Sequence, residues 1–195
     1  MDEGYIKFNC NWIQSNKIAL NKVTALNTWR DIMYQKGLIG MYPDGIGFGN
    51  ISMRCDKKTF LISGTATGGL STLNESHYSL VTNYNLSTNT VTCEGPLKAS
   101  SESLTHALIY ECAETINAVI HIHNLNLWNK LIYEVPTSNE KIAYGTPEMA
   151  NEIKRLFDET TLSKEKIIVM GGHQEGIISF GKDLEEAGNI LLNQL

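Results

Sequence analysis

Two histidines separated by a single residue are the feature of this sequence best suited to chemistry. His121 and His123 lie in Ala118-Val-Ile-His-Ile-His-Asn124, where the β-branched residues around them favour a strand. Successive side chains of a strand point to opposite faces, so both imidazoles share one face and the isoleucines share the other. Such a pair offers two metal ligands, although a His-x-His also arises by chance in a chain with five histidines.

A third ligand is needed, because a catalytic zinc ion takes three protein ligands and keeps one position open. His173 is the best candidate, since it follows an apolar run and two glycines in Val169-Met-Gly-Gly-His173. A loop at the end of a strand can deliver such an imidazole to a cleft. An ordinary loop histidine is the alternative. His77 has no partner in the pattern, and we assign it a structural role.

Glu102 and His106 form a second candidate pair, because a spacing of four places them on one face of a helix. A carboxylate near a metal is a natural base for removing a proton next to a carbonyl, and a histidine one turn away can orient it or bind substrate. The alternative is a solvent-facing pair with little effect on stability.

These residues need a rigid scaffold, and the apolar patterning predicts an α/β fold with a central, mostly antiparallel sheet between layers of helices. Its 195 residues suit a single domain spanning the whole chain. Helices are predicted for 17–35, from a cap at Ser100 or Ser101 through Cys112, for 149–157 and for about 184–192. Strands are predicted for 51–55 paired with 59–63, 78–82 paired with 90–93, 118–124, 166–170 as a central strand, and 176–180.

Two glycine-rich stretches are candidates for contact with a ligand. Asp44-Gly-Ile-Gly-Phe-Gly-Asn50 permits unusual dihedral angles and close approach to backbone amides. Gly64-Thr-Ala-Thr-Gly-Gly69 is rich in small and hydroxyl residues that suit a phosphate cradle. Plain connecting turns are the alternative for both.

Composition excludes several other classes of function. The net charge is −5 and the 16 basic residues are scattered, which argues against a nucleic-acid partner. The four cysteines are widely spaced without a Cys-x-x-Cys, so we expect reduced thiols. No apolar run approaches the roughly 18 residues that span a bilayer, and the start Met1-Asp-Glu-Gly4 carries acid where a secretory signal carries base. A cytoplasmic protein without a membrane partner is expected.

Six short blocks, read in order, resemble the class II aldolase/adducin family. The resemblance extends from about Leu20 to the C-terminus. The blocks are Gly49-Asn-Ile-Ser52, Leu61-Ile-Ser-Gly-Thr65, Lys98-Ala-Ser-Ser-Glu102 with His106, His121-Ile-His123, Tyr144-Gly-Thr146 and His173.

The resemblance implies a zinc-dependent lyase that makes or breaks a carbon–carbon bond in a small, phosphorylated sugar or hydroxy-carbonyl compound through a metal-stabilised enediolate. It implies one zinc ion per subunit and a homotetramer with active sites near subunit boundaries. The implied roles are zinc ligands for His121, His123 and His173, acid/base catalysis for Glu102, and phosphate binding for Asn50, Thr65, Ser100 and Ser101.

Three alternatives share the resemblance. Pentulose-phosphate 4-epimerases and methylthioribulose-phosphate dehydratases have a similar metal core. The adducin head domains keep the fold as a scaffold without the metal site, but a scaffold has no physical need for three histidines and a glutamate converging in a cleft.

The chain also departs from the family pattern. Gln174-Glu175 stands between the third histidine and Gly176, which makes Glu175 a candidate extra ligand, hydrogen-bond partner or substrate contact. The segment from His123 to Tyr144 is short where fuculose-phosphate aldolases supply a tyrosine acid from a neighbouring subunit, and Tyr133 is the one substitute we name. The 64–69 turn is also richer in glycine and hydroxyl residues than the phosphate turn of the aldolases. Together these departures leave the identity of the substrate and of the proton donor open.

Overall fold

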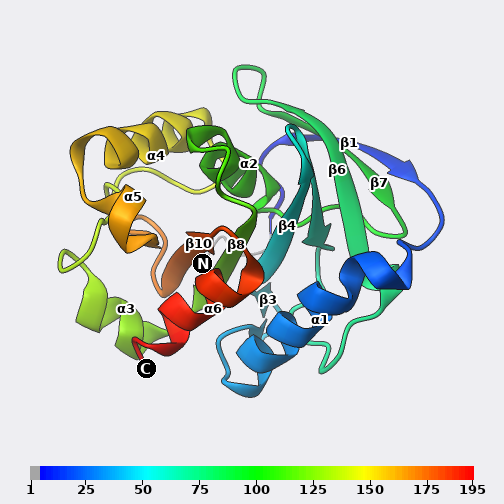
Figure 1. Ribbon diagram of the computed structural model, residues 1–195, viewed down its shortest axis with the longest axis horizontal. Coiled ribbons are helices and arrows are strands. Elements are labelled where there is room, and N and C mark those ends of the chain that lie inside the picture. The colour runs from blue at the N-terminus through cyan, green and yellow to red at the C-terminus, as the bar shows by residue number, and fades with distance from the viewer. Residues whose placement is uncertain (1–4) are drawn as a thin grey trace.

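An eight-stranded sheet forms the centre of the computed structural model, which describes residues 5–195 (Figure 1). The acidic start of the chain therefore lies outside the described residues. Only the β1–β7 pair is parallel among the neighbouring strands of this sheet, so the predicted mostly antiparallel sheet is confirmed. In spatial order the strands are β1 (Asn9–Gln14), β7 (Thr90–Gly95), β6 (Tyr78–Asn85), β5 (Thr59–Ser63), β4 (Asn50–Asp56), β8 (Ala118–His123), β10 (Gly176–Gly181) and β9 (Ile167–Val169).

Helices cover both faces of the sheet, which confirms the layered α/β fold. One core cluster joins the sheet to α1 (Leu20–Gln35), α3 (Leu125–Leu131) and α6 (Leu184–Leu192). The other joins it to α2 (Ser103–Cys112), α4 (Pro147–Glu159) and α5 (Leu162–Glu165). Figure 1 shows α1 and α6 next to each other across one face. A 3-10 turn (Glu75–His77) precedes β6, and a small hairpin of β2 (Gly40–Met41) and β3 (Gly47–Phe48) precedes β4.

The alternation along β8 decides which face carries the histidines. Ile120 and Ile122 lie in the cluster with α1 and α6, whereas Val119 lies in the cluster with α2 and α4. Because side chains alternate along a strand, His121 and His123 face the layer of α2 and α4. The predicted separation of the imidazoles from the isoleucines is confirmed.

Some predicted boundaries and positions are wrong. Helix α1 begins at Leu20 rather than Lys17, and Leu20 is itself exposed. Neither Ser100 nor Ser101 caps α2: Glu102 occupies that position without a side-chain cap, and Ser100 Oγ instead accepts from Glu102 N. Strand β9 lies at the edge of the sheet, where the 136–138 segment hydrogen-bonds to Val169 and covers it.

Several elements were not predicted from the sequence: β1, the β2–β3 hairpin, the 3-10 turn, α3 and α5. Strand β1 mixes polar and apolar residues and is largely exposed, so its pattern is weak. Helix α3 has seven residues, fewer than the helical period needs to become visible. Across the described part of the chain, no helix has both the length and the apolar character needed to cross a bilayer.

Candidate metal centre and anion pocket

Three histidines from two parts of the sheet converge in a buried cluster. His121 and His123 come from β8, and His173 comes from the turn between β9 and β10. Their ligand nitrogens all lie within 4.8 Å of one another, and the Nε2 atoms of His123 and His173 are 2.9 Å apart. All three side chains are at most 9% exposed. The sequence-predicted triad is therefore brought together.

The sheet fixes the backbone of the cluster from both sides. Strand β8 pairs with β4, which places Asn50 opposite His121, and with β10, which places Gly176 opposite His123. A Cβ at Gly176 would collide with the ring of His173 and approach His121 Nε2 to 3.3 Å. Glycine at this position thus makes room for both imidazoles.

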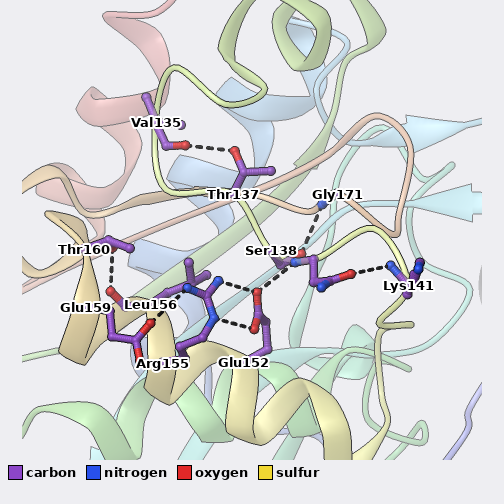
Figure 2. A network of polar contacts seen from close by, with 11 residues as sticks. Val135, Thr137, Ser138, Lys141, Glu152, Arg155, Leu156, Glu159, Thr160 and Gly171 are labelled. Carbon is purple, nitrogen blue, oxygen red and sulfur yellow. Dashed lines mark hydrogen bonds and ion pairs between the residues drawn. The ribbon is translucent and has the colours of Figure 1, made fainter.

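The turn that carries His173 is held by a polar network anchored on α4 (Figure 2). Ser138 Oγ accepts from Gly171 N at 3.0 Å, and Glu152 accepts from Asn139 N at 2.8 Å. A Cβ at Gly171 would overlap the carbonyl oxygen of Ser138. The 136–141 segment therefore lies directly against the glycines that precede His173, and the network holds the backbone of this turn in place.

Further contacts orient each ring. Tyr42 Oη lies 2.9 Å from His123 Nδ1, and Asn50 Nδ2 lies 3.3 Å from His121 Nδ1. The ring of Tyr144 meets His173 edge to face, with 4.6 Å between centroids. The cluster is therefore a preorganised set of imidazoles, as metal sites require of their surroundings.

The donor set fits a divalent metal ion. His121 Nε2 is buried and has no hydrogen-bond partner among the described residues, so a bound ion would supply a contact that this nitrogen lacks. Burial, reinforced by charge on His123 and His173, holds the pKa of His121 well below 6.5, so this imidazole is neutral. Neutral imidazole nitrogens are preferred zinc ligands, and three of them leave a position for a substrate oxygen.

A pocket beside the cluster collects the four predicted phosphate-binding residues. Asn50, Thr65, Ser100 and Ser101 line it together with the backbone of both glycine-rich stretches. Thr65 N donates to Lys98 O at 2.9 Å, which joins the 64–69 turn to the segment before α2. Asn50 connects the histidine cluster with the pocket, because its amide contacts His121 and the residue also lines the pocket.

The 64–69 turn is built rigidly. Thr67 Oγ1 donates to Gly64 O at 2.7 Å, and Ala66 adopts a left-handed φ of 60°. Beneath it, the fully buried Arg30 of α1 donates from Nη2 to Thr67 O at 3.1 Å and to Gly68 O at 2.9 Å. The pocket residues Ser100 and Ser101 come just before the N-terminal end of α2, and the N-terminal end of a helix favours an anion.

Glu102 and His106 are buried, so the alternative of a solvent-facing pair is wrong. Glu102 directly follows the pocket residue Ser101 at the start of α2. His106 Nδ1 lies 2.7 Å from Ser52 Oγ, and burial lowers the pKa of His106 to about 3. His106 is thus a neutral, hydrogen-bonded core residue.

Residues 32–192 match the family described as Class II Aldolase and Adducin N-terminal domain. The chain belongs to this family. Class II aldolases use a divalent metal ion, and the cluster of three histidines provides a site for one.

Relatives agree with this membership. The chain is similar to an L-fuculose phosphate aldolase of Methanocaldococcus jannaschii, with 31% identity over 103 residues that cover 46% of this chain and 53% of that protein. The match thus spans about half the length of that relative. A solved L-fuculose 1-phosphate aldolase superimposes with a TM-score of 0.66 at 18% identity, covering 90% of this chain and 82% of the other. The L-fuculose-1-phosphate aldolase from Thermus thermophilus superimposes with a TM-score of 0.59 at 20% identity, and the match covers 90% of this chain and 94% of the other. These structures share the fold.

In this class II aldolase family member, tyrosines at the metal centre were missed from the sequence. Tyr42 and Tyr144 contact His123 and His173, whereas the predicted substitute Tyr133 is 73% exposed. Tyr144 stands in a family block and could have been noticed there. Tyr42 carries no such signal. His77 has the predicted structural role, since its Nδ1 accepts from Asn74 N in a capping box.

The inserted Gln174-Glu175 brings Glu175 to the metal centre. Glu175 Oε2 accepts from the hydroxyl of Tyr42 at 2.7 Å. Of the three roles considered for this carboxylate, the structure shows the hydrogen-bond partner.

Proposed function

We propose that this protein is a zinc-dependent class II aldolase-type lyase that makes or breaks a carbon–carbon bond in a small, phosphorylated sugar or hydroxy-carbonyl compound. One observation carries the proposal: Asn50 contacts His121 and also lines the anion pocket. A metal centre adjoining an anion pocket suits a substrate with a carbonyl at one point and a phosphate close by.

His121, His123 and His173 would hold the zinc ion. When bound, the ion would act as a Lewis acid that polarises the substrate carbonyl and stabilises the negative charge that develops next to it. The neutral state of His121 supports this assignment, because a protonated imidazole cannot bind a metal.

The chain's own residues would do the rest of the chemistry. Thr65, Ser100 and Ser101 would donate hydrogen bonds from their hydroxyls to the phosphate, with Asn50 beside them. Anchored there, the reacting carbons would be held in a fixed position, which lowers the entropic cost of reaction. In the bond-forming direction Glu102 would remove the proton next to the substrate carbonyl, and in cleavage it would return that proton to the enediolate carbon. Its burial supports this role, because water is kept away from the carboxylate.

A panel of ketose phosphates incubated with the zinc-loaded protein tests the proposal. A lyase releases an aldehyde and a smaller carbonyl phosphate, an epimerase yields an epimer, and a dehydratase releases water. We expect aldehyde release. Epimer formation or water loss would assign the metal centre to the epimerase or dehydratase type instead. Inactivity on the whole panel with zinc bound would contradict the enzyme proposal.

We also propose that the chain forms a homotetramer, as the resemblance to the family implies, and that it works in the cytoplasm, as its composition leads us to expect. Sizing chromatography with light scattering measures the assembly directly, and fractionation of the source cells measures the location. A monomer with full activity would contradict an active site that depends on subunit boundaries.

A further inference from the structure

The hydroxyl of Tyr42 lies between a carboxylate and a histidine of the metal centre. It donates to Glu175 Oε2 at 2.7 Å and lies 2.9 Å from His123 Nδ1. Both distances are those of good hydrogen bonds. The three side chains come from different parts of the chain: the β2–β3 hairpin, the turn before β10 and strand β8.

The direction of these hydrogen bonds follows from the number of protons available. A carboxylate accepts only, and a phenol has one proton to give. With that proton donated to Glu175, the Tyr42 oxygen can only accept from His123. His123 must then carry its proton on Nδ1, and a neutral imidazole with Nδ1–H has its lone pair on Nε2.

We propose that Glu175 and Tyr42 are positioning residues that hold His123 in its Nδ1–H form and so present the Nε2 lone pair to the divalent ion. The inference rests on the proposed metal centre and adds the chain's own means of preparing one ligand for it. A ligating histidine whose other nitrogen donates to a fixed acceptor is a stronger and better oriented ligand.

The geometry inside the cluster agrees with this assignment. His123 Nε2 points at His173 Nε2, 2.9 Å away. If His123 Nε2 carries the lone pair, this contact is a hydrogen bond donated by His173. His121 contrasts with His123, because its Nδ1 faces the neutral amide of Asn50 at the longer distance of 3.3 Å.

Both positioning residues are held by their backbones. Tyr42 N donates to Ile46 O at 2.8 Å, which closes the hairpin turn, and the Tyr42 ring packs on Phe48 with 4.6 Å between centroids. Glu175 adopts a left-handed φ of 73°, and its carbonyl accepts from Asn124 N, the residue after His123. A strained conformation of this kind persists where the surroundings impose it. Here it directs the carboxylate toward Tyr42.

Zinc affinity, measured by competition with a chelator, tests the inference on Tyr42→Phe. Removing the hydroxyl should weaken zinc binding by about 10- to 100-fold, the usual effect of losing such an outer partner. Tyr78→Phe is the matched control, since it removes another tyrosine hydroxyl bond, to Asn27 Oδ1 at 2.7 Å, on the opposite face of the sheet. The zinc affinity of this control should stay within about twofold of that of the parent chain. Equal affinities for the two variants would overturn the inference.

Two variants of Glu175 extend the test. Glu175→Ala should weaken zinc binding, and Glu175→Gln should recover part of the loss because its amide oxygen still accepts from Tyr42. Equal affinity for Glu175→Ala and the parent chain would count against the positioning role.

Histidine-selective ¹⁵N NMR of the metal-free chain gives a readout independent of the ion. We expect His123 to carry its proton on Nδ1 in the parent chain and to become a tautomer mixture in Tyr42→Phe. A proton on Nε2 in the parent chain would overturn the inference even if zinc binds. Failure of the proposed function looks different: the parent chain would bind no zinc or would leave every ketose phosphate unchanged.

Discussion

The Nε2 atoms of His123 and His173 lie 2.9 Å apart although 50 residues separate them in the chain. The β8–β10 pairing creates this proximity, because it sets Gly176 opposite His123 and so returns the turn carrying His173 to the same end of the sheet. The metal centre is therefore a product of sheet topology, and changes that leave the sheet intact can test its parts one at a time.

Glu102→Gln should abolish carbon–carbon bond chemistry while leaving zinc bound. The amide keeps the shape of the side chain but cannot take up a proton, so kcat should fall by about 10²- to 10⁴-fold. Steady-state kinetics together with metal content measures both effects. Glu111→Gln, on the exposed end of the same helix, is the matched control and should retain kcat. An active Glu102→Gln variant would remove this residue from the acid/base role.

Arg30→Met should weaken phosphate binding although Arg30 does not line the pocket. The change removes two charged hydrogen bonds to the 64–69 turn and a buried positive charge beneath it. We expect a stability loss of about 2–4 kcal/mol and a clear rise in the dissociation constant for inorganic phosphate, measured by calorimetry.

The control for Arg30 is Arg54→Met. Arg54 also donates to backbone carbonyls, those of Tyr110, Ala113 and Ile116, but lies toward the far end of β4. It should lose stability without losing phosphate affinity. Equal phosphate affinities in both variants would show that Arg30 supports only the fold.

We expect Glu152 to make the free energy of unfolding depend on pH in the acidic range. Hydrogen bonds from Arg155 hold the pKa of Glu152 below its usual value, so the folded state favours the carboxylate. The stability that Glu152 contributes is fully present above about 4.3, the pKa of a glutamate in the unfolded chain. It is lost as the pH falls through the lower pKa that Glu152 has in the folded chain. Glu152→Gln should cost about 1–2 kcal/mol at pH 7, at the low end because Arg155 is partly exposed.

Urea unfolding at several pH values measures this effect. The difference between the parent chain and Glu152→Gln should shrink below about pH 4. Glu159→Gln provides the control, since Glu159 is 64% exposed and contacts the same arginine at 3.4 Å. A difference between parent and Glu152→Gln that stays constant down to about pH 2 would contradict the assigned role.

Local patterns predicted much of the scaffold and the ligands. The alternation in β8 placed His121 and His123 on one face because Ile120 and Ile122 need the other, and the structure agrees. The hairpin of β4 and β5 was likewise visible from two apolar runs around a polar turn. These features depend only on neighbours in the sequence.

Features that depend on distant packing could not be predicted in this way. Tyr42 reaches His123 only because the β2–β3 hairpin folds over β8, and nothing in its own neighbourhood indicates this. The edge position of β9 was missed for the same reason, since a segment distant in sequence covers it. The burial of His106 results from the packing of α2 against the sheet around Ser52.

Metal analysis of the purified protein is the decisive experiment for the proposed metal centre. We expect one zinc ion per chain, no bound zinc in His121→Ala/His123→Ala, and full occupancy in the control His77→Ala, whose imidazole only caps a short turn. Zinc retained by the double variant, or a parent chain that binds none, would contradict a metal centre built on these histidines.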